Sequence, residues 1–179
     1  EDALAPKAFI LESKVQPPYP GGFGLNRAEL PGMPRFSNAR FLGSYPFARL
    51  ELSDPRVPLD VALECFNPFI PGNERDSGLP AAIFYWQLKN TGRNPVSLTV
   101  VASLQNIAGI DSFGQNENEY KDEGVFRGLM MRTRKHPENS PKFGNMALVT
   151  THDAITYNPC WDRGGWFDAQ SLFWNDLLD

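Results

Sequence analysis

The side chains that carry most enzyme chemistry are few in this chain and widely spaced. It contains only two histidines, His136 and His152, and two cysteines, Cys65 and Cys160. It has no Cys-x-x-Cys or His-x-x-x-His pair, no Gly-x-Ser-x-Gly elbow and no glycine-rich phosphate loop. Metal binding, nucleophilic hydrolysis and nucleotide binding all need such groupings. The sequence therefore assigns no catalytic residue, no cofactor-binding residue and no metal ligand, and it predicts no cofactor.

Paired carboxylates are a further catalytic grouping to consider, because glycosidases assemble their two acidic side chains from distant parts of the chain. Spacing alone distinguishes none of the acidic residues here. Glu64 alternates with apolar residues, as a solvated or cross-strand paired side chain on a strand would. Asp162 and Asp168 draw more attention because they flank tryptophans. The candidates are Glu64, Asp111, Asp153, Asp162 and Asp168.

Three of the four tryptophans lie close together near the C-terminal end, within the 18 residues from Tyr157 to Trp174. Indole rings can stack on the C–H faces of sugars, or they can fill a core or a domain interface. Packing against a further domain is the more economical interpretation, and both stay open. The residues of this sugar-stacking site or domain interface are Trp161, Trp166, Trp174, Asp162 and Asp168.

The elements that must position these residues are predicted to be β-strands. Apolar and polar residues alternate over 45–53 and again over 59–65, as in half-buried strands. The intervening turn, 54–58, holds two prolines that cannot donate to a ladder, so a hairpin is expected. A second hairpin is predicted from strands at 81–90 and 96–106, joined by the glycine-containing loop 91–95. Leu50, Leu63 and Leu98 are expected to face the core.

Further strands are predicted at 7–15, 124–134 and 145–151, whereas 107–123 is expected to be a long exposed connection. Residues 166–179 are expected to form a strand and a helical turn, or a short helix. Six or seven strands with almost no helical periodicity indicate an all-β fold, an antiparallel β-sandwich. No linker divides the chain, so residues 1–179 are predicted to form a single β-sandwich domain or a fragment of one.

Composition narrows the partners and the location. The net charge of −4 gives no general attraction for nucleic acid. No apolar stretch approaches the roughly 18 residues that span a bilayer, so no transmembrane segment is predicted. The first residues lack the features of a signal peptide. Cys65 and Cys160 could pair, but Cys65 lies at an apolar strand position typical of a reduced thiol. These observations favour a cytoplasmic location.

Two segments carry a specific resemblance. RFSNARFLGSYPFARLELSD at 35–54 and ECFNPFIPGNERDSGLPAAIFYWQLKNT at 64–91 contain a proline loop that strand physics does not dictate. The later NPCWDRGGWFDAQSLFWNDL at 158–177 adds a tryptophan-rich ending. Together they resemble the N-terminal β-sandwich domain of the non-lysosomal glucosylceramidase and bile-acid β-glucosidase family, glycoside hydrolase family 116. The similarity extends over most of 35–178.

The resemblance implies a non-catalytic N-terminal domain that supports a large helical (α/α) barrel, which is absent from this chain and carries the glutamate nucleophile and aspartate acid/base. The implied partners are that barrel and a β-glucoside or glucosylceramide-like substrate. The glycine-rich and Arg-Gly-x-Phe-Gly-Arg-Trp segments that precede this region in the family are missing. We therefore expect a partial sandwich whose exposed strand edges could mediate oligomer formation. A carbohydrate-binding module using the tryptophans and a structural assembly domain are the alternative functions.

Overall fold

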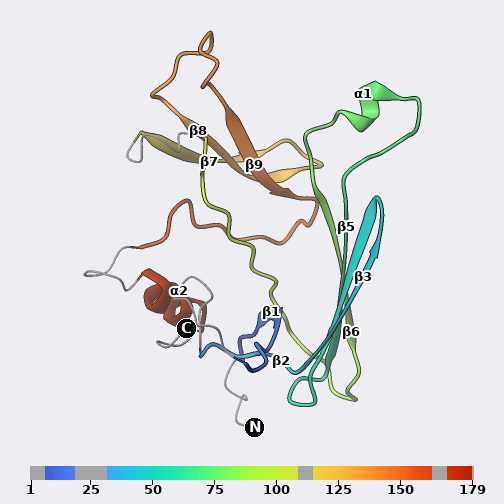
Figure 1. Cartoon of the computed structure of the whole chain (residues 1–179). Helices are drawn as coiled ribbons and strands as arrows, with labels where there is room; N and C mark the ends of the chain where they lie inside the picture. The colour runs from blue at the N-terminus through green and yellow to red at the C-terminus, as the bar shows by residue number, and fades with distance from the viewer. Residues whose placement is uncertain (1–6, 19–31, 109–114, 163–168, 179) are drawn as a thin grey trace. The chain divides into compact units, whose positions relative to one another are not determined.

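The computed structural model describes residues 7–18, 32–108, 115–162 and 169–178. The chain divides into two compact units, one running to Leu98 and the other from Thr99 to Leu177. Each unit contains one antiparallel sheet of three or more strands (Figure 1). The predicted fold class, all-β with antiparallel sheets of the sandwich-like kind, is therefore confirmed.

The first unit holds a four-stranded antiparallel sheet in the order β3-β4-β5-β6. The hairpin predicted around residues 54–58 is confirmed, because the second and third of these strands pair along their length, with Leu50 opposite Leu63. The strand predicted at 81–90 is also present and adds to the other side of this hairpin. The four strands are β3 (Asn38–Ser44), β4 (Phe47–Ser53), β5 (Leu59–Phe66) and β6 (Ile83–Asn90).

A small core lies on one face of this sheet. Phe36, Leu52 and Val61 are 2–3% exposed and pack together. Phe36 comes from the short strand β2 (Arg35–Phe36), which pairs in parallel with β1 (Ile10–Ser13). The first strand is thus present but shorter than the predicted 7–15. Several partly buried side chains complete the cluster: Phe9, Leu11, Leu50, Val57, Leu59, Trp86 and Leu88.

The turn between β4 and β5 is held by one buried carboxylate. Asp54 accepts hydrogen bonds from the backbone N–H of Ser37 at 2.8 Å and from that of Arg56 at 2.9 Å. The guanidinium of Arg56 adds two bonds of 2.7 Å to the same carboxylate and lies over the ring of Phe9. These hydrogen bonds, foremost those from Arg56, hold the pKa of Asp54 far below its usual range although desolvation opposes them. The carboxylate therefore ties the turn to Ser37, the residue that follows β2.

The second unit contains a three-stranded antiparallel sheet in the order β7-β8-β9, formed by β7 (Asn116–Asp122), β8 (Arg127–Thr133) and β9 (Asn145–Thr150). Met131 in the central strand is 2% exposed. The buried side chain of Asn106 donates to the carbonyl oxygens of Glu117 and Arg132, at 3.3 and 3.2 Å. The segment preceding β7 is thereby attached to this sheet through a side chain.

The hairpin predicted from 81–90 and 96–106 is wrong, because residues 96–106 form no strand. Leu98, expected in the core, is 44% exposed. The cause lies in the connection: the Thr91 N–H donates to the carbonyl of Pro58 at 2.9 Å, and the Asn90 side chain bonds to Gly92 and Asn94. These bonds fasten the start of the connection to the β4–β5 turn. Alternating apolar residues alone therefore did not ensure strand pairing.

The prediction that 107–123 is an exposed connection is also wrong, because β7 occupies 116–122. This strand lacks an apolar alternation, and cross-strand ion pairs take its place. Glu117 lies opposite Arg132 and pairs with it at 3.1 Å. At the chain end, the short-helix alternative is correct, since α2 spans Ala169–Leu178. The predicted proline loop contains one additional helical turn, α1 (Glu74–Ser77).

Candidate functional site

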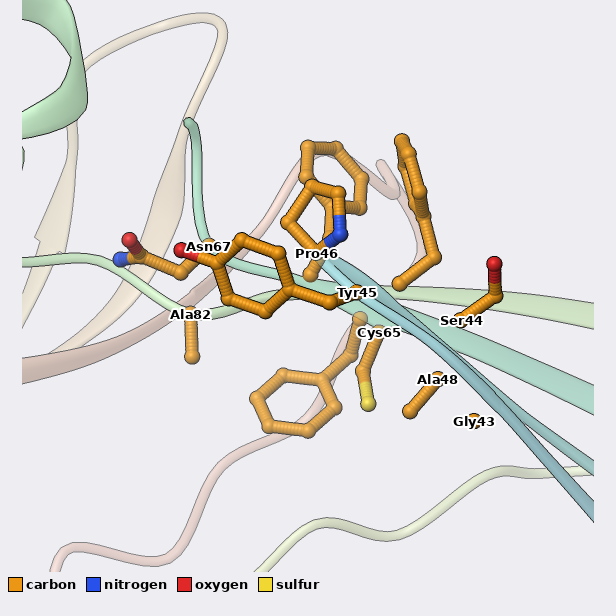
Figure 2. Close-up of a pocket in the computed structure, with 11 residues that line it drawn as sticks. Gly43, Ser44, Tyr45, Pro46, Ala48, Cys65, Asn67 and Ala82 are labelled. Carbon is orange, nitrogen blue, oxygen red and sulfur yellow. The ribbon is translucent and has the colours of Figure 1, made fainter. Parts of the chain in front are cut away.

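The β3–β4 turn forms one end of the four-stranded sheet, and an open hollow of about 460 Å³ lies beside it (Figure 2). Eleven residues line the hollow, and none of them carries a charge. Figure 2 shows Cys65, Ala48 and Gly43 on one side of the strands, with Tyr45 next to them. The volume is within the range of small-molecule sites, but the lining offers few polar groups.

The sheet is apolar on both faces at this end. Strand register aligns Phe84 with Cys65 and Ala48 in one row, on the face that carries the core. The neighbouring row joins Phe47, Phe66 and Ile83, and therefore lies on the opposite face. We call the exposed large side chains here the apolar end: Phe41, Leu42, Tyr45, Phe47, Ile83, Phe84 and Tyr85, which are 38–81% exposed.

On the face opposite the core, a charged network begins in the row that also holds Leu42 and Tyr85 of the apolar end. Arg49 bonds to Glu51 at 2.9 Å and to Glu64 at 2.6 Å, which joins β4 and β5. The hydrogen bonds that Arg49 donates to Glu51 and, to a lesser extent, to Glu64 raise the pKa of its guanidinium. This half of the face has the polar character expected of a sheet surface in water. The apolar half does not.

The loop between β5 and β6 borders the apolar end and is held by side-chain hydrogen bonds. The amide of Asn67 donates to the carbonyl oxygens of Leu79 and Ala81, at 3.3 and 2.7 Å, and so closes the loop at its base. The Ser77 hydroxyl bonds to both the N–H and the carbonyl of Ile70. Asn73 caps α1 by accepting from the Asp76 N–H. The loop therefore presents a preformed surface.

This loop adds apolar side chains of its own to the surface beside the hollow. Phe69, Ile70 and Leu79 are 47–51% exposed. The ring of Phe69 contacts that of Tyr45 edge-on, with 5.3 Å between centroids. Glu74, Arg75 and Asp76 in α1 are exposed and charged. An apolar surface bordered by charged residues is the usual composition of a protein interface.

The predicted tryptophan site is only partly within the described residues. Trp161 stacks on Phe173 of α2, with 4.4 Å between ring centroids and an 11° interplanar angle, and remains 37% exposed. Trp174 is half-buried on the same helix, and Asp162 is exposed. Trp166 and Asp168 lie outside the described residues. The structure thus joins Trp161 to α2 but leaves the proposed sugar-stacking role untested.

Two of the acidic candidates form ion pairs. Glu64 binds Arg49, as described above, and Asp153 binds Arg127. Asp111 and Asp168 lie outside the described residues.

Burial opposes ionisation of Glu117, but hydrogen bonds from Arg134 and Arg132 outweigh it and lower its pKa. The described ranges contain no group of three or more His, Cys, Asp or Glu side chains that could hold a metal ion.

Both thiols are free, with Cys65 half-buried and Cys160 exposed. None of the helices in the described part of the chain is long and apolar enough to cross a membrane.

Sequence reasoning missed the apolar end, although the chain carries a signal for it. The run from Ala81 to Trp86 is apolar at six consecutive positions, and Phe41 and Leu42 are adjacent. A strand with one solvent-exposed face should alternate apolar and polar residues, so consecutive apolar residues indicate a strand covered on both faces. The alternation of apolar and polar residues in β4 and β5 indicates only the face that carries the core.

The family comparison covers almost the whole chain. A family model described as "beta-glucosidase 2, glycosyl-hydrolase family 116 N-term" matches residues 9–179. The match begins before β1 and includes all three sheets and α2. It therefore includes the apolar end as well as the tryptophan-rich ending.

Proposed function

This chain belongs to the N-terminal domains of glycosyl-hydrolase family 116, and from this we propose that it is a non-catalytic domain that supports the catalytic domain of a β-glucosidase. The catalytic partner is a helical barrel, and the substrate of the assembled enzyme is a β-glucoside, with a glucosylceramide-like lipid as the more specific candidate. The domain contributes a rigid surface to that partner. It supplies neither the nucleophile nor the acid/base.

The pKa shifts of the acidic side chains support a non-catalytic role for this chain. A retaining glycosidase needs one carboxyl group whose pKa is raised, so that it stays protonated and can act as an acid. Here the pKa of Asp54 is lowered by Arg56, and that of Glu119 is lowered by Lys121. Asp54 is also committed to four hydrogen bonds that fix a turn. Such groups are suited to structure rather than to proton transfer.

Hydrolysis of an aryl β-glucoside tests the proposal. We expect no turnover by this chain alone, and turnover when it is joined to a family 116 catalytic domain. That catalytic domain should also be less active or less stable without this chain. Turnover by the isolated chain that persists through repeated purification would contradict the proposal. A catalytic domain that is equally active and equally stable without this chain would contradict it too.

A carbohydrate-binding role is the second candidate, and the exposure of Trp161 favours it. Phe173 stacks on its indole ring, which nevertheless remains 37% exposed and could take a sugar. Titration with a β-glucoside should then change tryptophan fluorescence in a saturable manner, and Trp161→Ala should weaken the response without unfolding the chain. An unchanged spectrum at high glucoside concentration would exclude this role.

A further inference from the structure

The first unit contains another hollow, of about 370 Å³, where β1 ends and β2 begins. Its described lining combines three basic side chains with three apolar ones and includes no carboxylate: Lys14, Arg35 and Arg56, with Val15, Met33 and Pro34. All of these residues belong to the first unit. The hollow is therefore electropositive, although the formal net charge of the chain is −4.

Two of the three cations bind a carboxylate that lies outside this lining. Arg35, which is only 6% exposed, donates to Glu12 at 2.9 Å. Arg56 donates to Asp54 through Nε and Nη2. Lys14 is exposed, and its ammonium group has no ion pair or hydrogen bond within the described residues. The hollow therefore carries one positive charge that Glu12 and Asp54 do not balance.

The guanidinium of Arg56 is fixed in its orientation. Its Nη2 group also donates to the carbonyl of Arg35 at 2.7 Å, and its Cζ lies 5.0 Å from the ring centroid of Phe9. The Nη1 group takes no part in these bonds and keeps its N–H donors. Lys14 follows β1, whereas Arg56 lies in the β4–β5 turn. The hollow is thus bordered by charged donors from two separate elements.

We propose that this hollow binds the phosphate group of a small organic phosphate monoester. A phosphate accepts through oxygens that point in different directions, which suits donors on separate elements. A carboxylate is planar and pairs best with two donors of one guanidinium, and the Nε and Nη2 donors of Arg56 are already bound to Asp54. The apolar part of the lining suits the organic part of the ligand. This inference goes beyond the proposed function and does not rest on it.

Extended polyanions fit the hollow less well than a single phosphate group. Nucleic acids and anionic membranes present many charges in a row and are bound by runs of basic side chains. The described lining holds three cations, of which two are paired with carboxylates. The charge therefore matches one small anion.

Binding of phenyl phosphate to the chain tests the inference, with phenol and benzoate as comparison ligands that lack the phosphate. Saturation-transfer NMR follows the aromatic protons of all three. Lys14→Gln removes the unbalanced charge and leaves the backbone bond from residue 14 to Phe36 in place. Lys89→Gln is the matched control, because it removes the same charge at an exposed position of β6, outside the lining. Circular dichroism and thermal unfolding establish that both variants fold like the unaltered chain.

We expect phenyl phosphate to bind saturably and about tenfold or more tightly than phenol or benzoate. Lys14→Gln should weaken this binding by about fivefold or more, and Lys89→Gln by less than about twofold. No saturable binding, equal effects of the two variants, or equally tight binding of benzoate would each overturn the inference.

Vesicles of phosphatidylcholine and phosphatidic acid distinguish a lipid headgroup from a small phosphate ester. We expect no sedimentation of the chain with these vesicles that depends on Lys14. Sedimentation that Lys14→Gln abolishes, in a chain that does not bind phenyl phosphate, would make the site a membrane contact and overturn the inference. The activity of a joined catalytic domain tests the proposed function separately, so failure of one leaves the other standing.

Discussion

The central strand of the three-stranded sheet contains a glycine that no other residue can replace without a rearrangement. Gly128 lies in β8 opposite Val149 of β9, with a φ of +156°. A methyl group added at this position would lie 2.1 Å from the carbonyl oxygen of Leu148 and 2.8 Å from the Cα of Val149. Both neighbours are backbone atoms of the paired strand. Gly128→Ala must therefore push β8 and β9 apart or distort their ladder.

The loss of stability in Gly128→Ala has two causes, the backbone conformation and the overlap with β9, and its size is the sum of both. The unfavourable backbone conformation contributes about 1–3 kcal/mol, and the overlap with β9 contributes about 1–3 kcal/mol. We expect Gly128→Ala to lower the free energy of unfolding by about 2–6 kcal/mol, measured by urea unfolding followed by circular dichroism. Gly124→Ala is the control, because its φ is +79° but no atom lies within 4 Å of the added methyl group. Gly124→Ala should lower the free energy of unfolding by about 1–2 kcal/mol. Equal losses for the two variants would refute the reasoning from the strand contact.

Three further perturbations test other parts of the structure. Leu52→Ala should lower the free energy of unfolding by about 2–5 kcal/mol because Leu52 is 3% exposed, whereas Leu42→Ala, on the exposed neighbouring strand, should change it by less than about 0.5 kcal/mol in urea unfolding. The lowered pKa of Asp54 means that its carboxylate stabilises the fold above its unfolded-state pKa of about 4, and that this stability is lost as the pH falls towards the folded-state pKa. Thermal unfolding of Asp54→Asn between pH 7 and pH 3 should therefore show a lower midpoint than the unaltered chain and a smaller decline of that midpoint with acid. An acid dependence equal to that of the unaltered chain would contradict this role of Asp54. Asn67→Ala removes the hydrogen bonds that close the β5–β6 loop, so amide hydrogen exchange should accelerate over 68–81 but not in β9. Equal exchange rates over 68–81 in Asn67→Ala and in the unaltered chain would contradict the role of Asn67.

The parts of the fold that could be predicted from the sequence are those where side-chain alternation and turn chemistry agree. The β4–β5 hairpin is one, because two prolines separate two alternating runs and Asp54 supplies the turn with an anchor. The segment 96–106 alternates equally well but forms no strand. Its course depends on local hydrogen bonds of the Asn90 side chain and on the long-range Thr91 bond to Pro58, and such contacts leave no periodic pattern. For the same reason β7 was missed, since Glu117 pairs with Arg132 across strands rather than alternating with apolar neighbours.

The candidate site was harder to predict than the fold. Attention to Trp161 and its neighbours followed from their chemistry, since aromatic clusters occur in both sugar sites and interfaces. The apolar end depends instead on register: only the pairing of β4 with β5, and of β5 with β6, shows that Phe47 and Phe84 lie in adjacent rows on opposite faces. Consecutive apolar residues from Ala81 to Trp86 indicated a strand covered on both faces. They did not show that the β5–β6 loop would extend the same surface.

The central claim, that this chain supports a catalytic domain without performing hydrolysis itself, is tested most directly by an activity measurement. Hydrolysis of an aryl β-glucoside is followed for this chain alone, for a family 116 catalytic domain alone, and for the two joined. The account predicts no turnover by this chain, and more active or more stable catalysis by the joined protein than by the catalytic domain alone. Turnover by the isolated chain that persists through repeated purification, or a catalytic domain equally active and equally stable without this chain, would contradict the account.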